Sequence, residues 1–114
     1  MIISICCILF SCDDIIEVDD ISQEEVTILA PVNSAVLNDN SVIFSWEAVE
    51  FAETYTIQIA TPTFSEALQI VEDSTLTATN FTRQLPNADY EWRVRAENSG
   101  YTTNYTLHQF SIED

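Results

Sequence analysis

The sequence has little positive charge, and this scarcity excludes one class of partner. It contains three arginines and no lysine against nineteen acidic residues, which gives a formal net charge of -16. Proteins bind a nucleic-acid backbone through clustered Lys and Arg side chains, and this chain would repel that backbone. Nucleic-acid binding is therefore excluded, and any attachment to an anionic membrane must be covalent or hydrophobic.

The residues that most enzymes use for chemistry are also scarce. Cys6, Cys7 and Cys12 all lie in the first dozen residues, so the rest of the chain can form neither a disulfide nor a cysteine metal site. His108 is the only histidine, and we expect it at an exposed or edge position of the last strand. No Gly-rich phosphate loop, Gly-x-Ser-x-Gly or His-x-x-x-His pattern occurs. We expect no enzyme, no catalytic residue, no metal and no cofactor.

One alternative for catalysis is a carboxylate pair. Glu47, Glu50 and Glu53 lie close together, and two of them could in principle act as acid and base. A small sandwich offers no deep pocket to raise one of their pKa values, so a solvated loop is the better interpretation.

The first eleven residues carry no charge and form an apolar run. At about 1.5 Å per residue this run is too short to cross roughly 30 Å of hydrocarbon, but it is long enough for the core of a signal peptide. It ends Leu-Phe-Ser-Cys at residues 9–12, which resembles the lipobox of bacterial lipoproteins. That resemblance implies that residues 1–11 are removed and that Cys12 carries the lipid.

Residues 12–25 come next, as the lipidated Cys and an acidic tether. Seven of the thirteen residues in Asp13–Glu25 are acidic, which indicates a self-repelling, extended segment. An acidic cluster after the lipidated Cys resembles the surface-export signal of bacteroidete-type lipoproteins, whereas Asp13 in a proteobacterial-type signal would imply inner-membrane retention. We favour export. A calcium loop is the other interpretation of these acids, but the spacing lacks the Gly and the final Glu of an EF-hand.

The body of the chain, residues 26–114, has the pattern of an all-β domain. Short runs rich in β-branched and aromatic residues alternate with turn residues, and no helical pattern occurs. We expect strands at Val26–Ala30, Ser41–Trp46, Thr54–Ala60, Ala67–Val71, Ser74–Phe81, Tyr90–Glu97 and Tyr105–Ile112. In the last strand Tyr105 and Leu107 are out of phase with Phe110 and Ile112, which predicts a β-bulge.

The stretch Leu85–Gly100 carries the clearest pattern. From Tyr90 its residues alternate, with Tyr, Trp, Val and Ala on one side and Glu, Arg, Arg and Glu on the other. Leu85, Pro86 and Tyr90 fit a tyrosine corner, in which a Tyr at a strand start donates to the backbone a few residues upstream. The charged side predicts cross-strand charge pairs on the solvent face.

Together these elements resemble a fibronectin type III domain, a seven-stranded β-sandwich. The resemblance implies that five residues form the structural core: Trp46, Tyr55, Leu85, Tyr90 and Trp92.

The expected function is that of a non-catalytic lipoprotein module, anchored in the outer membrane through its lipid and exposed on the cell surface. Its partner would be a glycan or an outer-membrane protein, bound through Tyr101 and Tyr105 in the loop before the last strand. The alternative is a structural spacer, or a truncated first repeat of a longer surface protein, with no ligand of its own.

Overall fold

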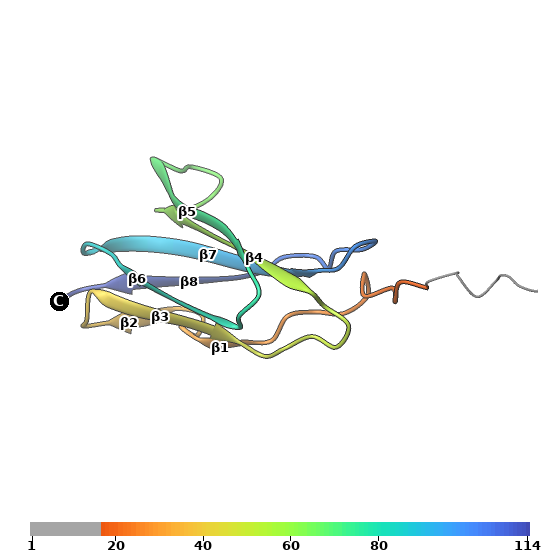
Figure 1. Ribbon diagram of the computed structural model, residues 1–114. Helices are drawn as coiled ribbons and strands as arrows, with labels where there is room; N and C mark the ends of the chain where they lie inside the picture. Colours follow the sequence, from red (N-terminus) through yellow and green to blue (C-terminus); the bar gives the residue numbers. More distant parts are fainter. Residues whose placement is uncertain (1–16) are drawn as a thin grey trace, which may run out of the picture.

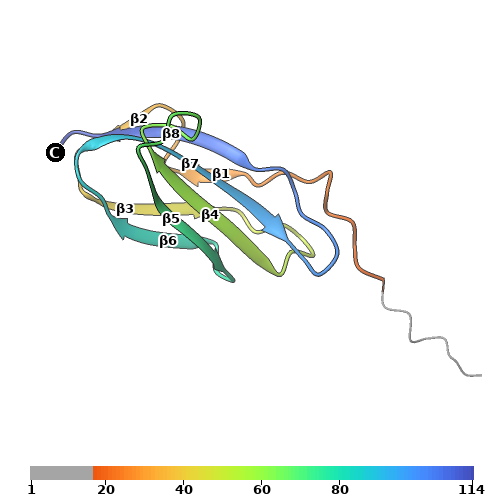
Figure 2. The same ribbon diagram turned by 90° about the horizontal axis from the view of Figure 1, so that it is seen from above.

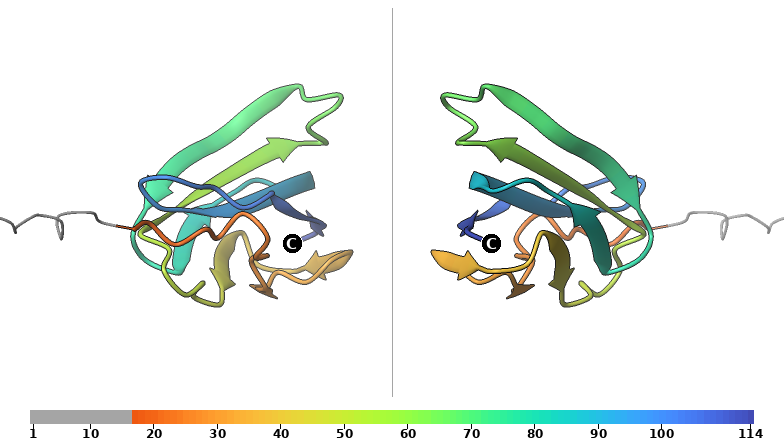
Figure 3. Two further views of the ribbon diagram at one scale, coloured as in Figure 1. Left: turned by 90° about the vertical axis from the view of Figure 1, so that its right-hand side faces the viewer. Right: turned by 90° about the vertical axis from the view of Figure 1, so that its left-hand side faces the viewer.

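The computed structural model describes residues 17–114, in which two β-sheets pack face to face (Figure 1). The strands of this part of the chain are β1 (Ile28–Ala30), β2 (Ala35–Leu37), β3 (Ser41–Trp46), β4 (Thr54–Thr61), β5 (Gln69–Leu76), β6 (Asn80–Gln84), β7 (Ala88–Glu97) and β8 (Thr106–Ile112). The smaller sheet has the order β1-β3-β6 and the larger one β2-β8-β7-β4-β5. Figure 3 shows the two layers from either end of the molecule.

Strand β7 lies at the centre of the larger sheet and shows the predicted alternation. Tyr90, Trp92, Val94 and Ala96 are buried, while the residues between them face the opposite side of the sheet. The Tyr90 hydroxyl donates to the Pro86 carbonyl over 2.7 Å, which is the hydrogen bond of a tyrosine corner. Burial raises the pKa of Tyr90, so this hydroxyl stays protonated and able to donate.

The core fills the space between the sheets with aromatic side chains. Phe44 of β3 meets Trp92 of β7 edge to face, with ring centroids 4.8 Å apart. The five residues expected in the core, Trp46, Tyr55, Leu85, Tyr90 and Trp92, are each at most 4% exposed. Aromatic and aliphatic burial on this scale holds the sandwich together in a chain whose described residues contain no cysteine.

Three details of the strands differ from the expectation. The turn between β5 and β6 lies at residues 77–79, so Ala67–Val71 and Ser74–Phe81 are not separate strands as predicted. β5 is an edge strand with polar residues on both faces, which removes the alternation that would have located it. The short strand β2 was not expected; it pairs parallel to β8 and brings the number of described strands to eight.

The predicted bulge in the last strand is absent. β8 pairs with β7 without interruption from Ile112 to Thr106. Leu107 is simply exposed on the outer face, while His108 lies in phase with Phe110 and is half-buried. At His108, β8 pairs with β7 alone, because β2 pairs only with Phe110–Ile112, so this part of β8 lies at the edge of the sheet as expected. The His108 Nδ1 lies 3.3 Å from the Pro31 carbonyl oxygen.

The segment before β1 also differs from an extended tether. Ile21 is 1% exposed and belongs to the core, and the Glu24 amide donates to its carbonyl in a tight turn. Nearer the N-terminus, the Asn98 side chain donates to the Asp19 carbonyl over 2.9 Å. Packing against the sandwich therefore begins before residue 26.

Replacing Ile21 tests whether this segment belongs to the folded domain. Ile21→Ala should lower the free energy of unfolding by about 2–4 kcal/mol, because it leaves a cavity in the core. Ile43→Ala is the matched control; Ile43 is 62% exposed, and its loss should cost about 1 kcal/mol or less. Urea denaturation followed by Trp fluorescence measures both. Equal effects of the two substitutions would contradict the core position of Ile21.

Candidate binding face on the larger sheet

The outer face of the larger sheet carries a cluster of two arginines and two aromatic rings. Arg93 and Arg95 project from β7 on the side opposite the core. The residues that alternate with them, Trp92 and Val94, point inward. The guanidinium carbon of Arg93 lies 4.1 Å from the ring centroid of Phe64 and 4.5 Å from that of Tyr105. The guanidinium carbon of Arg95 lies 4.9 Å from the Tyr105 ring. We call these four residues the arginine–aromatic cluster.

The loop between β4 and β5 brings Phe64 onto this face. Its backbone amide donates to the Glu91 carboxylate over 2.9 Å, and the Leu68 amide closes the loop by donating to the Thr61 carbonyl. Glu91 is thereby used to hold the loop and is not paired with an arginine. The position of the Phe64 ring over Arg93 thus depends on a contact between residues far apart in the sequence.

The charged residues of β7 form hydrogen bonds, and none of them forms a charge pair with a neighbouring strand in residues 17–114. Arg93 donates from Nε to the side-chain oxygen of Gln58 on β4 over 2.7 Å. Arg95 donates to Glu97 on its own strand over 2.8 Å. The prediction was wrong because the residues that face the β7 charges across the sheet are Thr, Gln, Ala and Leu, not residues of opposite charge.

Glu97 is the most strongly held carboxylate of this face. Burial by itself raises the pKa of its carboxyl group. Hydrogen bonds from Thr56, Arg95 and Thr54 outweigh burial, so the pKa lies below its ordinary value. Glu97 is consequently ionised at neutral pH and neutralises Arg95.

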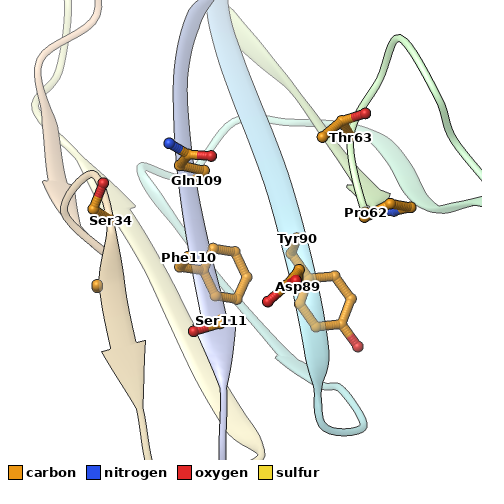
Figure 4. A pocket seen from close by; sticks show the side chains of 9 residues that line it. Ser34, Pro62, Thr63, Asp89, Tyr90, Gln109, Phe110 and Ser111 are labelled. Carbon is orange, nitrogen blue, oxygen red and sulfur yellow. The ribbon is translucent and has the colours of Figure 1, made fainter.

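A hollow of about 320 Å³ lies further along the same strands (Figure 4). Its walls come from the β1–β2 turn, the β4–β5 loop and strands β7 and β8, and they include the polar side chains of Ser34, Thr63, Asp89, Gln109 and Ser111. Thr63 is the neighbour of Phe64, so one loop borders both the hollow and the arginine–aromatic cluster. Hydroxyl, amide and carboxylate groups of this kind can hydrogen-bond a polar ligand.

The structure separates the two tyrosines that sequence reasoning selected. Tyr105 is half-buried and stacks on the arginines, whereas Tyr101 is 38% exposed at the tip of the β7–β8 loop. That loop lies at the end of the molecule where residue 17 enters, as Figures 1 and 2 both show. Asn98 fixes this arrangement by donating both to Asp19 and to the Phe51 carbonyl of the β3–β4 loop.

Glu47, Glu50 and Glu53 are exposed in the β3–β4 loop, as expected for a solvated segment. Within residues 17–114 no group of three or more His, Cys, Asp or Glu side chains could hold a metal ion. In the same range no helix is long and apolar enough to cross a membrane. Cys12, the expected lipidation site, lies outside the described residues.

The architecture is thus an all-β sandwich of two sheets, and comparison with solved structures identifies the fold. The fibronectin type III domain of human collagen alpha-1(XX) superposes with a TM-score of 0.59 at 13% identity, covering 82% of this chain and 90% of that one. The fibronectin(III)-like modules of Clostridium thermocellum CbhA give 0.56 at 10% identity, with 77% and 95% covered. An Fn3-like protein from Clostridium thermocellum gives 0.51 at 22% identity, with 71% and 88% covered.

These similarities confirm the predicted fibronectin type III fold, a module that is in general non-catalytic. At such identities the likeness shows the fold alone. No family model matches the sequence. No curated protein matches it either.

The depressed pKa of Glu97 predicts a pH-dependent contribution to stability. A carboxyl group with a lowered folded-state pKa stabilises the fold above its unfolded pKa of about 4.3, and that contribution disappears as the pH falls through the folded value. Glu97→Gln should therefore lower the urea midpoint at pH 7, and the difference from wild type should shrink as the pH is lowered to 3. Glu47→Gln, at an exposed glutamate, is the control and should change little at either pH.

Proposed function

We propose that the protein is a non-catalytic binding and presentation module, attached through lipid on Cys12 to the outer membrane and exposed on the cell surface. Its partner is a glycan or another outer-membrane protein. The apolar run before Cys12 and the acids after it support the anchor and the export. The open face of the larger sheet, with its cluster of cations and rings, supports a binding role.

The observation that carries this proposal is the docking of the N-terminal segment. Val18 lies against Gly100, where a Cβ added to the glycine would come within 3.3 Å of Val18 Cγ1, and Asn98 holds Asp19. The residues between Cys12 and Val18 could span roughly 20 Å at about 3.4 Å each. With an anchor at Cys12, the β3–β4 and β7–β8 loops would face the membrane, and the partner would meet the side and the far end of the sandwich.

This geometry argues against Tyr101 as the residue that binds a partner. Its loop lies beside the incoming N-terminal segment, so in an anchored protein the ring would point toward the lipid and not toward a partner outside the cell. Tyr105, on the open sheet face, is the better placed of the two candidate residues.

A spacer is the second candidate function, and one observation favours it. The described N-terminal segment (red to orange) and the C-terminus lie at opposite ends of the sandwich (Figure 1), an arrangement that suits a module holding two attachments apart. A spacer has no ligand of its own, so a test for glycan binding discriminates between the two functions.

The anchor and the surface location are tested in a Gram-negative host that processes lipoproteins. The wild type should incorporate labelled palmitate, remain with the membrane fraction and be cleaved when intact cells are treated with protease. Cys12→Ala should lose the label and leave the membrane. Cys7→Ala is the matched control from the same apolar run and should behave as the wild type does.

Two outcomes would contradict this proposal, one for the lipid anchor and one for the surface location. Membrane retention of Cys12→Ala would rule out the lipid anchor. A lipidated wild type that resists external protease until the cells are lysed would place the domain in the periplasm.

A further inference from the structure

Arg93 is the one cation of residues 17–114 whose charge is not balanced by a carboxylate. The other two arginines are paired, Arg83 with Glu72 and Arg95 with Glu97. Arg93 forms no ion pair within the described residues, although the chain has nineteen acids. Since both other arginines have an acidic partner, Arg93 differs from them in lacking one in this part of the chain.

The surroundings of Arg93 hold its guanidinium group in one orientation. Gln58 accepts from Nε, and the rings of Phe64 and Tyr105 contact the guanidinium plane. The Nη atoms donate no hydrogen bond to the described residues, so their N–H groups remain for a ligand. A guanidinium fork that is already oriented, with rings excluding water beside it, binds a carboxylate in two parallel hydrogen bonds at low entropic cost.

The charge around the cluster limits what kind of carboxylate it can take. Asp89 and Glu91 project from the same face of β7, and the whole chain carries -16, so a polyanionic partner is repelled. A sugar chain with a single carboxylate near Arg93 avoids this repulsion. Its hydroxyl groups can reach the polar hollow around Asp89 and Gln109, about 13 Å along β7 from Arg93 at about 3.3 Å per residue.

We infer that the arginine–aromatic cluster binds the carboxylate of a uronic acid in a partner glycan. The carboxylate accepts from the Nη groups of Arg93, and the sugar ring lies against the exposed parts of Phe64 and Tyr105. The adjacent hollow takes a neighbouring sugar unit. This inference rests on the proposed binding role and is independent of the anchor at Cys12.

Side-chain NMR of the three arginines tests it directly. In the ¹⁵N-labelled full chain, titration with sodium glucuronate should move the Nε–Hε signal of Arg93 along a saturating curve with a millimolar Kd. Neutral glucose at the same concentrations should not move it, and sodium chloride at matched ionic strength should not either. The Arg83 signal is the internal control and should stay in place, because Glu72 already occupies that guanidinium.

Variants separate this site from a general effect of charge. Arg93→Gln should abolish the response of the backbone amides of β7 and β8 to glucuronate, and Arg93→Lys should weaken it about tenfold because it keeps the charge but loses the planar fork. Arg83→Gln should leave the response unchanged. The dispersed amide spectrum of each variant shows whether it is folded.

Three results would overturn the inference. Equal shifts of Arg83 and Arg93 would show a non-specific ionic effect. No saturable shift with glucuronate would leave the spacer function favoured, with the anchor still to be judged by the protease experiment. A stronger response to a short poly-glutamate peptide than to glucuronate would make an acidic peptide the partner in place of a glycan.

Discussion

The edge-to-face contact between Phe44 and Trp92 joins the two sheets at the centre of the core. Trp92 lies on β7, which pairs with β4 on one side and β8 on the other, so its inward orientation sets the orientation of the whole larger sheet. Since successive side chains of a strand point to opposite faces, burying Trp92 forces Arg93 outward. A shift of one residue in register would bury the arginine and expose the tryptophan. The core and the open face are therefore two consequences of the same packing contact.

Each of the three arginines stabilises a different part of the molecule. Arg83 reaches from β6 to Glu72 and to the Val71 carbonyl on β5, and so closes the side of the sandwich where the edges of the two sheets meet. Arg95 holds Glu97 on its own strand. Arg93 contacts Gln58 and two rings instead of an acid. The excess of acids elsewhere favours solubility and repels anionic polymers. Against this acidic surface, an arginine without an acidic partner among the described residues is an unusual feature.

Much of the fold is predictable from local sequence pattern, and the candidate site is not. The alternation of β3, β4 and β7 and the tyrosine corner at Tyr90 are visible because each depends on residues that are close in sequence. β5 was predicted as parts of two strands, Ala67–Val71 and Ser74–Phe81, because an edge strand with polar residues on both faces shows no clear period. The contact of Phe64 with Arg93 depends on a loop whose backbone amide hydrogen-bonds Glu91, a residue far away in the sequence. Ile21, in turn, lies in a stretch whose many acids indicate an extended chain. Ile21 shares this stretch with Ile15, Ile16 and Val18, so the local pattern does not single it out as the residue that is buried.

The docked N-terminal segment connects this buried isoleucine to the proposed orientation on a membrane. Because Ile21 packs in the core and Asn98 hydrogen-bonds the Asp19 carbonyl, only a short length of chain separates Cys12 from the folded domain. If Cys12 is anchored, the end of the sandwich that carries the N-terminal segment cannot turn away from the membrane. The loops of that end, which carry Tyr101, would then be the least accessible part of the surface. The side of the sandwich that bears Tyr105 and Arg93 would stay open to the exterior. In a protein anchored at Cys12, these two contacts of an acidic stretch would therefore decide which face a partner can meet.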